Sequence, residues 1–130
     1  MEKQRVFISF DYDHDVDLKN LLIGQSKNPD SPFEIIDMSI KESILHNWQE
    51  YARFRIKRCD VVIVICGEHT DSAKGIDLEI KISNEENKPY YLLKGRADKL
   101  CLKPKSSRYY DKLWPWTWDN LKLLFEKKSK

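Results

Sequence analysis

Residues 61–83, VVIVICGEHTDSAKGIDLEIKIS, carry the strongest indication of the fold of this protein. It begins with six apolar residues, Val61–Cys66, a run typical of a strand that is buried on both faces in a parallel sheet. A polar loop follows at residues 67–74, and isoleucine and leucine then recur at four-residue spacing, which predicts a helix. A strand, a polar loop and a helix in this order often carry a binding site.

The composition is that of a folded, water-soluble domain. The chain has 130 residues, of which 41% are hydrophobic and 34% are charged, so we expect a single domain over residues 1–130. Its apolar runs are shorter than the roughly 18 residues that a membrane span needs, and the N-terminal residues lack a signal-peptide core. We therefore expect a cytoplasmic protein with no membrane partner.

Charges and cysteines argue against two further classes of function. The 23 basic and 21 acidic residues are interspersed, so we expect no nucleic-acid partner. Cys59, Cys66 and Cys101 share no metal-like spacing, and Cys66 ends the buried strand, where a thiol usually packs in the core.

Strands and helices alternate along the rest of the chain. We predict strands at residues 5–10, 33–38 and 89–94, with a possible short edge strand at 100–102. Three more helices are expected, beginning after an acidic turn at residues 11–15, after Asn47 and after Thr117. The expected caps are Asp13 or Asp15, Asn47 and Thr117, and the expected inner faces comprise Leu18, Leu21 and Leu22; Trp48, Ala52, Ile56 and Cys59; and Trp118, Leu121, Leu124 and Phe125.

This alternation predicts an α/β fold, a flavodoxin-like three-layer sandwich with a central parallel sheet. Ligands of such sheets bind beyond the carboxyl ends of the strands. Here that rim consists of residues 10–15, 37–42, 66–72 and 94–96.

The sequence argues against several classes of nucleotide-binding, phosphoacceptor and metal sites. The chain has neither a Gly-rich dinucleotide motif nor a P-loop, and Cys66 and Gly67 stand where a phosphoacceptor domain needs Asp. Asp11, Asp13 and Asp15 could suggest a hard metal ion, but acidic residues stabilise a helix N-terminus in any case. We therefore predict no metal site.

Glu79, in the helix predicted at the end of residues 61–83, is the candidate catalytic residue. Asp77 has Lys81 four residues on, whereas the three- and four-residue neighbours of Glu79 include no cation. A carboxylate in largely apolar company near the strand ends is a candidate functional group. Spacing alone leaves open that Glu79 faces solvent or the edge of the core.

Five segments together resemble the bacterial TIR-like family, which includes the TIR component of the Thoeris anti-phage system. The family's first strand reads as an FISY-like element, which Phe7 to Phe10 match, and its essential glutamate is matched by Glu79. The segments are RVFISFDYDHD at residues 5–15, FEIIDMS at 33–39, DVVIVICGEHT at 60–70, GIDLEIKIS at 75–83 and KLWPWTWDNLKLL at 112–124.

The resemblance implies that the protein cleaves NAD⁺ at the nicotinamide–ribose bond, with Glu79 as the catalytic residue and NAD⁺ as substrate, without a cofactor. It also implies an ADP-ribose-derived product, expected to be cyclic, that signals to an effector protein, and self-association through TIR surfaces. The residues expected to bind substrate are Ser9, Phe10, Asp11, Tyr12, Asp37, Met38, Trp48 and His69.

Two other functions stay open at this point. The domain could be a non-catalytic interaction module of the TIR type, or an enzyme like the nucleoside deoxyribosyltransferases, which also use a carboxylate against a ribosyl carbon. The aromatic residues Tyr109, Tyr110, Trp114 and Trp116 could form a lid on the site or a self-association surface.

Overall fold

The computed structural model describes residues 3–39 and 47–126, to which all structural statements here refer. Strands and α-helices alternate up to the fourth strand, as predicted, and the fifth strand then follows the fourth without a helix between them. The elements are β1 (Gln4–Ser9), α1 (Val16–Ser26), β2 (Phe33–Met38), α2 (Trp48–Lys57), β3 (Val61–Cys66), the 3₁₀ turn η2 (Thr70–Ser72), α3 (Lys74–Glu85), β4 (Tyr90–Lys94), β5 (Leu113–Pro115) and α4 (Trp118–Phe125).

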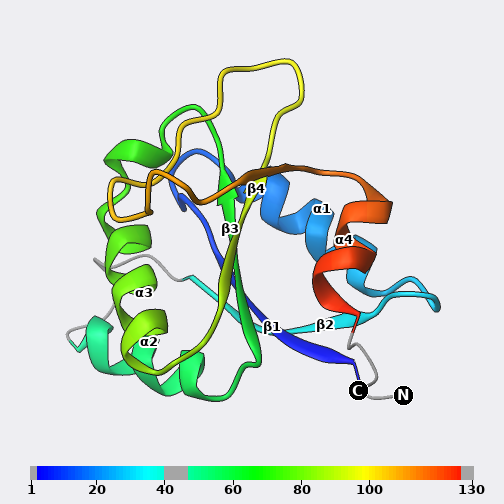
Figure 1. Cartoon of the computed structure of the whole chain (residues 1–130). Helices are drawn as coiled ribbons and strands as arrows, with labels where there is room; N and C mark the ends of the chain where they lie inside the picture. Colours follow the sequence, from blue (N-terminus) through cyan, green and yellow to red (C-terminus); the bar gives the residue numbers. More distant parts are fainter. Residues whose placement is uncertain (1–2, 40–46, 127–130) are drawn as a thin grey trace.

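The strands form one sheet in the order β2-β1-β3-β4-β5, and every neighbouring pair is parallel. This is the flavodoxin-like strand order, with β1 and β3 side by side at the point where the direction of winding reverses. Figure 1 shows α2 and α3 on one face of the sheet and α1 and α4 on the other. The predicted three-layer α/β fold is confirmed.

β3 lies at the centre of both cores because its side chains alternate between the two faces of the sheet. Val62, Val64 and Cys66 pack into the cluster on the side of α2 and α3, together with the buried residues of those helices. The intervening residues of the strand pack with Leu22 of α1 and Leu121 of α4. All six residues of the strand are at most 3% exposed, which explains its continuous apolar sequence.

Two details of α1 differ from the prediction. Residues three and four apart both lie on one helix face, but only Leu18 and Leu22 join the core cluster on the side of α1 and α4, and Leu21 is 55% exposed. Asp15, one of the two predicted caps, stands at the N-cap position, but its side chain makes no cap hydrogen bond in the described structure. The Asp15 carboxylate is turned into the protein instead, where it contacts Arg96.

The predicted edge strand at residues 100–102 is also wrong. Leu100 is 79% exposed, and the backbone N–H of Leu102 bonds to the carbonyl of Gly67 in an irregular segment. The fifth strand is β5, in which Leu113 pairs with Leu92 of β4. The three residues of β5, the last of them a proline, are too few to show a strand periodicity of their own, so the pairing with β4 defines this strand.

Other predictions of local structure are confirmed. The α2 stripe of Trp48, Ala52 and Ile56 is buried. Thr117 caps α4, since its side-chain oxygen accepts a 3.1 Å hydrogen bond from the N–H of Asn120. Asn47 is the N-cap residue of α2, but its side chain makes no cap hydrogen bond.

The three cysteines are free and buried, in agreement with a packing role. Burial raises the pKa of the Cys59 thiol to about 11 and also raises the pKa of Cys66. Both thiols are therefore protonated, and poor nucleophiles, near neutral pH.

Candidate active site

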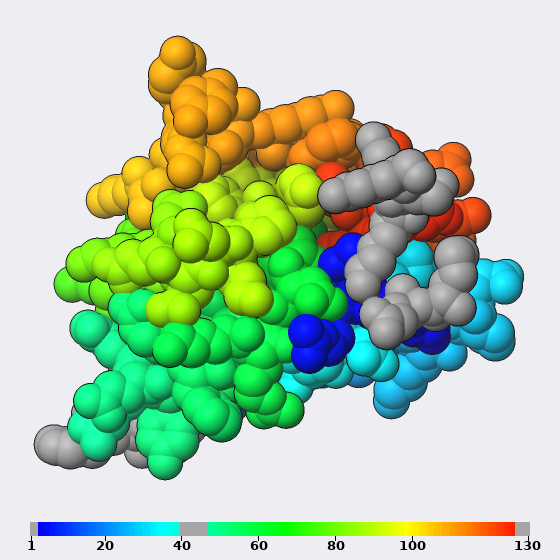
Figure 2. All heavy atoms as spheres, turned by 60° about the horizontal axis from the view of Figure 1, so that its bottom comes forward, coloured from blue at the N-terminus to red at the C-terminus, as the bar shows by residue number. Residues whose placement is uncertain are grey.

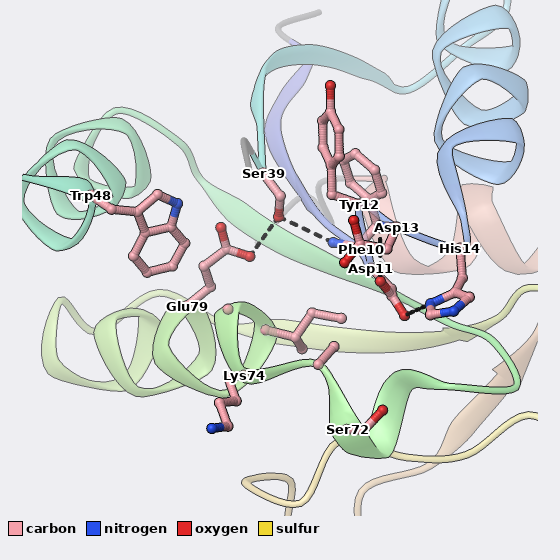
Figure 3. Close-up of a pocket in the computed structure, with 13 residues that line it drawn as sticks. Phe10, Asp11, Tyr12, Asp13, His14, Ser39, Trp48, Ser72, Lys74 and Glu79 are labelled. Carbon is pink, nitrogen blue, oxygen red and sulfur yellow. Dashed lines mark hydrogen bonds and ion pairs between the residues drawn. The ribbon is translucent and has the colours of Figure 1, made fainter. Parts of the chain in front are cut away.

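A cavity of about 420 Å³ lies beyond the carboxyl ends of β1 and β2, where α3 begins. Figure 3 shows side chains from the β1–α1 loop, the end of β2, α2 and the start of α3 around it. The lining residues are Phe10, Asp11, Tyr12, Asp13, His14, Ser39, Trp48, Ser72, Ala73, Lys74, Gly75, Ile76 and Glu79. Of the predicted rim, residues 10–14, 39 and 72 line this cavity, whereas its other described residues do not, and residues 40–42 lie outside the described structure.

Glu79 is the most buried carboxylate of the cavity wall, with 1% of its surface exposed. Its Oε1 atom accepts hydrogen bonds from the hydroxyls of Ser9 and Ser39, both at 2.6 Å. Neither serine lies on α3, so the helix alone could not have shown these contacts. Of the alternatives that the spacing left open, a solvent-facing Glu79 is therefore excluded.

Ser39 connects three parts of the site. Its backbone N–H donates to the carbonyl of Ile8 at 2.8 Å, which continues the pairing of β1 and β2 beyond the last residue of β2. Its hydroxyl accepts a 3.2 Å hydrogen bond from the N–H of Phe10 and donates to Glu79. The hydroxyl thus holds the start of the β1–α1 loop and the carboxylate in one arrangement.

Aromatic rings form two walls of the cavity. Trp48 of α2 is 7% exposed and lies beside Glu79 in Figure 3. Phe10 and Tyr12 stack with their ring centroids 5.9 Å apart, and Tyr12 is 43% exposed. Rings in such positions can stack on the planar bases of a nucleotide.

The β1–α1 loop also carries an aspartate–histidine pair. Asp11 Oδ1 accepts the N–H of Asp13 at 3.0 Å, and Asp11 Oδ2 lies 2.8 Å from His14 Nδ1. The His14 ring stacks on His69, with centroids 4.1 Å apart. His69 therefore supports the wall from the β3–α3 loop but does not line the cavity.

Arg96 ties this loop to the sheet. Its guanidinium donates to Asp15 Oδ1 at 3.2 Å and to both carboxylate oxygens of Asp17 at 3.0 Å. Burial raises the pKa of Asp15 above its ordinary 3.8 despite this pairing, whereas the hydrogen bond from Arg96 lowers the pKa of Asp17. Asp15 Oδ2 has no hydrogen-bond partner in the described structure, and a Cβ on Gly67 would lie 2.5 Å from it.

The structure brings most of the predicted site residues together. Phe10, Asp11, Tyr12, Trp48 and Glu79 line the cavity, and Ser9 contacts Glu79 from β1.

The other two predicted residues of β2, Asp37 and Met38, do not line the cavity. Asp37 forms ion pairs with Arg55 of α2, at 3.5 Å, and with Arg58 just after this helix, at 3.9 Å. Met38 packs against the core on the side of α1 and α4. Contact of any of these residues with a substrate stays a prediction.

Sequence reasoning did not single out Ser39 or Lys74. Ser39 directly follows a predicted strand, and this position at the rim was the signal that could have identified it. Lys74 begins α3 and lines the cavity, and Figure 3 shows its side chain directed away from Glu79.

The predicted lid is not seen at this cavity, whose described lining includes none of the four aromatic residues proposed for it. Trp114 and Trp116 pack against the core on the side of α1 and α4, whereas Tyr109 and Tyr110 are 93% and 65% exposed. A role of the tyrosines in self-association stays a prediction.

Within residues 3–39 and 47–126, no group of histidine, cysteine and acidic side chains is arranged to hold a metal ion. The helices of the same residues lack the length and apolar character that crossing a membrane requires.

Comparison with known proteins identifies one family. The model of the family described as Thoeris protein ThsB, TIR-like domain, matches residues 7–96. Among solved structures, a crystal structure of a prokaryotic SEFIR domain is similar in fold, with a TM-score of 0.55 and 18% sequence identity. The match covers 93% of this chain and 86% of the SEFIR chain. No match was found among curated protein sequences.

Proposed function

The chain belongs to the family of TIR-like domains of the Thoeris protein ThsB, and on this premise we propose that it cleaves the nicotinamide–ribose bond of NAD⁺. One observation carries the proposal. The Glu79 carboxylate is 1% exposed, lines the cavity, and accepts hydrogen bonds from Ser9 and Ser39. NAD⁺ is the substrate in this reaction, and no cofactor takes part.

The reaction suits a single carboxylate. When the glycosidic C–N bond of NAD⁺ breaks, its electron pair neutralises the pyridinium, so nicotinamide leaves as a neutral molecule without a general acid. Positive charge develops on the ribosyl carbon, as in other glycoside cleavages. Glu79 would stabilise this charge, and its burial limits the screening of the interaction by water.

The serine hydroxyls give the carboxylate a fixed position. Ser9 and Ser39 donate to the same oxygen from two adjacent strands, so Glu79 does not need to reorient during the reaction.

The cavity has the size and lining for a nucleotide. Its volume of about 420 Å³ falls in the range of roughly 300–1,000 Å³ of small-molecule sites. Trp48 on one side and Phe10 with Tyr12 on the other would stack on the bases of NAD⁺.

The fate of the ribosyl cation decides the product. Water would give ADP-ribose, whereas a nucleophile within the same nucleotide would give a cyclic product, and a water-poor site favours the second. We propose that the product is a cyclic ADP-ribose derivative that signals in the cytoplasm to an effector protein during anti-phage defence. In this proposal, self-association through TIR surfaces accompanies activity.

Mass spectrometry of small molecules from cells with and without phage tests the proposal. Cells that express the wild type should accumulate an ADP-ribose derivative, and Glu79→Gln should lower it by roughly 100-fold or more, since the amide keeps the volume but removes the charge. Glu68→Gln is the matched control, because Glu68 is exposed and does not line the cavity. Product formation by a folded Glu79→Gln protein would refute the assignment.

Two further measurements on the purified protein, of its oligomeric state and of base exchange, separate the two other functions. Concentration-dependent oligomers, no turnover under any trigger and a functional Glu79→Gln variant would show an interaction module. Exchange of free bases with deoxynucleosides would show an enzyme like the nucleoside deoxyribosyltransferases.

A further inference from the structure

A second open cavity lies at the other end of the sheet, between the C-terminal end of α3 and the start of β4. Its volume is about 520 Å³. The residues that line it are Asn84, Asn87, Lys88, Pro89, Tyr90 and Arg108. None of them belongs to the cavity around Glu79, so this site is separate from the proposed reaction.

The turn after α3 holds one wall of this cavity in a fixed conformation. Asn87 has a φ angle of 58°, the left-handed conformation that commonly ends a helix. The N–H of Lys88 donates to the carbonyl of Ser83 at 2.8 Å, and the N–H of Asn87 to that of Asn84 at 3.2 Å. These two carbonyls at the negative end of α3 therefore already accept hydrogen bonds. The neighbouring side chains of Asn84, Asn87 and Lys88 carry hydrogen-bond donors.

Arg108 forms the opposite wall. Its guanidinium carbon lies 5.8 Å from the ring centroid of Tyr90 and 5.9 Å from that of Tyr110. Stacking occupies the faces of a guanidinium and leaves its N–H edges for acceptors in its plane. Arg108 makes no ion pair with a carboxylate in the described part of the chain, since Asp111 binds its backbone N–H and the Tyr90 hydroxyl instead.

The segment that carries Arg108 is well anchored. Lys103 Nζ donates to the carbonyls of Arg108, Tyr109 and Asp111 at 2.9, 3.2 and 2.7 Å. Ser106 donates to Asp77 of α3 through its N–H and its hydroxyl. Figure 2 shows this part of the chain, in orange, projecting from the surface next to the yellow-green residues of α3 and β4. The backbone that carries Arg108 is therefore held in place before any ligand arrives.

The charges of the cavity select an anion. Lys88 and Arg108 are cations, Asn84 and Asn87 carry amide donors, and the described lining includes no carboxylate. The nearby acids of α3 are already paired, since Glu85 and Glu86 accept hydrogen bonds from Arg53 at 2.5 and 2.6 Å.

We propose that this cavity binds the phosphate group of a small molecule, with Arg108 and Lys88 as its charged contacts. Guanidinium N–H groups match the spacing of phosphate oxygens, and the lysine adds a second charge. The asparagine amides can donate to the remaining oxygens. A free phosphate and a nucleotide present the same group to this site.

NMR titration of the full chain with inorganic phosphate, pyrophosphate and AMP tests the proposal. Saturable shifts are expected for the side-chain amides of Asn84 and Asn87, with a dissociation constant on the order of 1 mM that rises with salt concentration. Tighter binding of AMP than of phosphate would identify a nucleotide site, and equal affinities would identify a site for the phosphate group alone.

Variants complete the test. Arg108→Gln and Lys88→Gln should each weaken binding by roughly tenfold, while Lys105→Gln, an exposed cation on the same segment outside the cavity, should leave it unchanged. The proposal is overturned by shifts confined to the Glu79 cavity, by the absence of saturation, or by full affinity in a folded Lys88→Gln, Arg108→Gln double variant. NAD⁺ cleavage is not the readout, so each proposal can fail without the other.

Discussion

Ser9, the last residue of β1, donates a 2.6 Å hydrogen bond to the carboxylate of Glu79 on α3, a residue 70 positions later in the sequence. Ser39, which directly follows β2, donates to the same oxygen atom at the same distance. The ends of two adjacent strands thus meet one helix at a single carboxylate oxygen. This arrangement exists only because β1 lies between β2 and β3 in the sheet.

Ser9→Ala and Ser39→Ala should each lower kcat for nicotinamide release. A hydrogen bond to a charged group is worth about 1.5–3 kcal/mol, which corresponds to roughly a tenfold to hundredfold loss. Steady-state kinetics on each folded variant measures this loss. Ser107→Ala is the control, because its hydroxyl bonds to the carbonyl of Pro104 away from the cavity, and it should keep the wild-type kcat. Unchanged kcat in both site variants would show that the serines do not position Glu79.

Gly67→Ala should destabilise the fold by about 1–3 kcal/mol. The new Cβ would lie 2.5 Å from Asp15 Oδ2, and that short, buried side chain is held by Arg96 and has little room to move. Gly24→Ala is the opposite case, since a Cβ at this position of α1 meets nothing within 4 Å. It should stabilise the protein by about 0.5–1 kcal/mol through helix propensity. Urea unfolding of both variants checks the contrast, and equal effects would contradict it.

Asp15→Asn should change how stability depends on pH. Because burial raises the pKa of Asp15 in the folded protein, the folded state binds this proton more tightly than the unfolded chain does. The stabilisation is fully present below the ordinary pKa of 3.8 and is lost as pH rises through the raised value. The stability of Asp15→Asn relative to the wild type should therefore increase with pH over this window.

Unfolding by urea at a series of pH values, starting below pH 4 and ending at neutrality, measures that difference. A relative stability that stays constant or falls as pH rises would contradict the prediction. Asp17→Asn is the control of opposite sign, since Arg96 lowers the pKa of Asp17 and its contribution is lost as pH falls.

Thr117→Ala should cost about 1 kcal/mol of stability, because it removes the hydroxyl that caps α4. Asn47→Ala, at the N-cap of α2, should cost less, since the Asn47 side chain makes no cap hydrogen bond in the described structure. Thermal unfolding of the two variants tests the difference, and an Asn47→Ala variant that loses as much stability as Thr117→Ala would refute it.

Local patterns in the sequence determined the layers of this protein. The continuous apolar run of Val61–Cys66 predicted a central strand, and the recurring isoleucines of residues 76–82 predicted the helix that follows it. The order of strands and helices then led to a parallel sheet of the flavodoxin-like class. Glu79 stood out because its helix neighbours included no cation, and the resemblance to TIR-like domains added its role.

The tertiary structure decided which side chains meet. Ser9 and Ser39 reach Glu79 across 70 and 40 residues of sequence, and Arg96 reaches Asp15 across 81. Such long separations in sequence cannot be predicted from the period of a helix or a strand, because these contacts follow from the order and register of the strands in the sheet. The exposure of Leu21 and the pairing that makes Leu113–Pro115 a strand depend on neighbouring elements in the same way. Local periodicity therefore determined most of the elements, and the resemblance to TIR-like domains singled out the candidate carboxylate, whereas contacts between distant segments determined the geometry of the site.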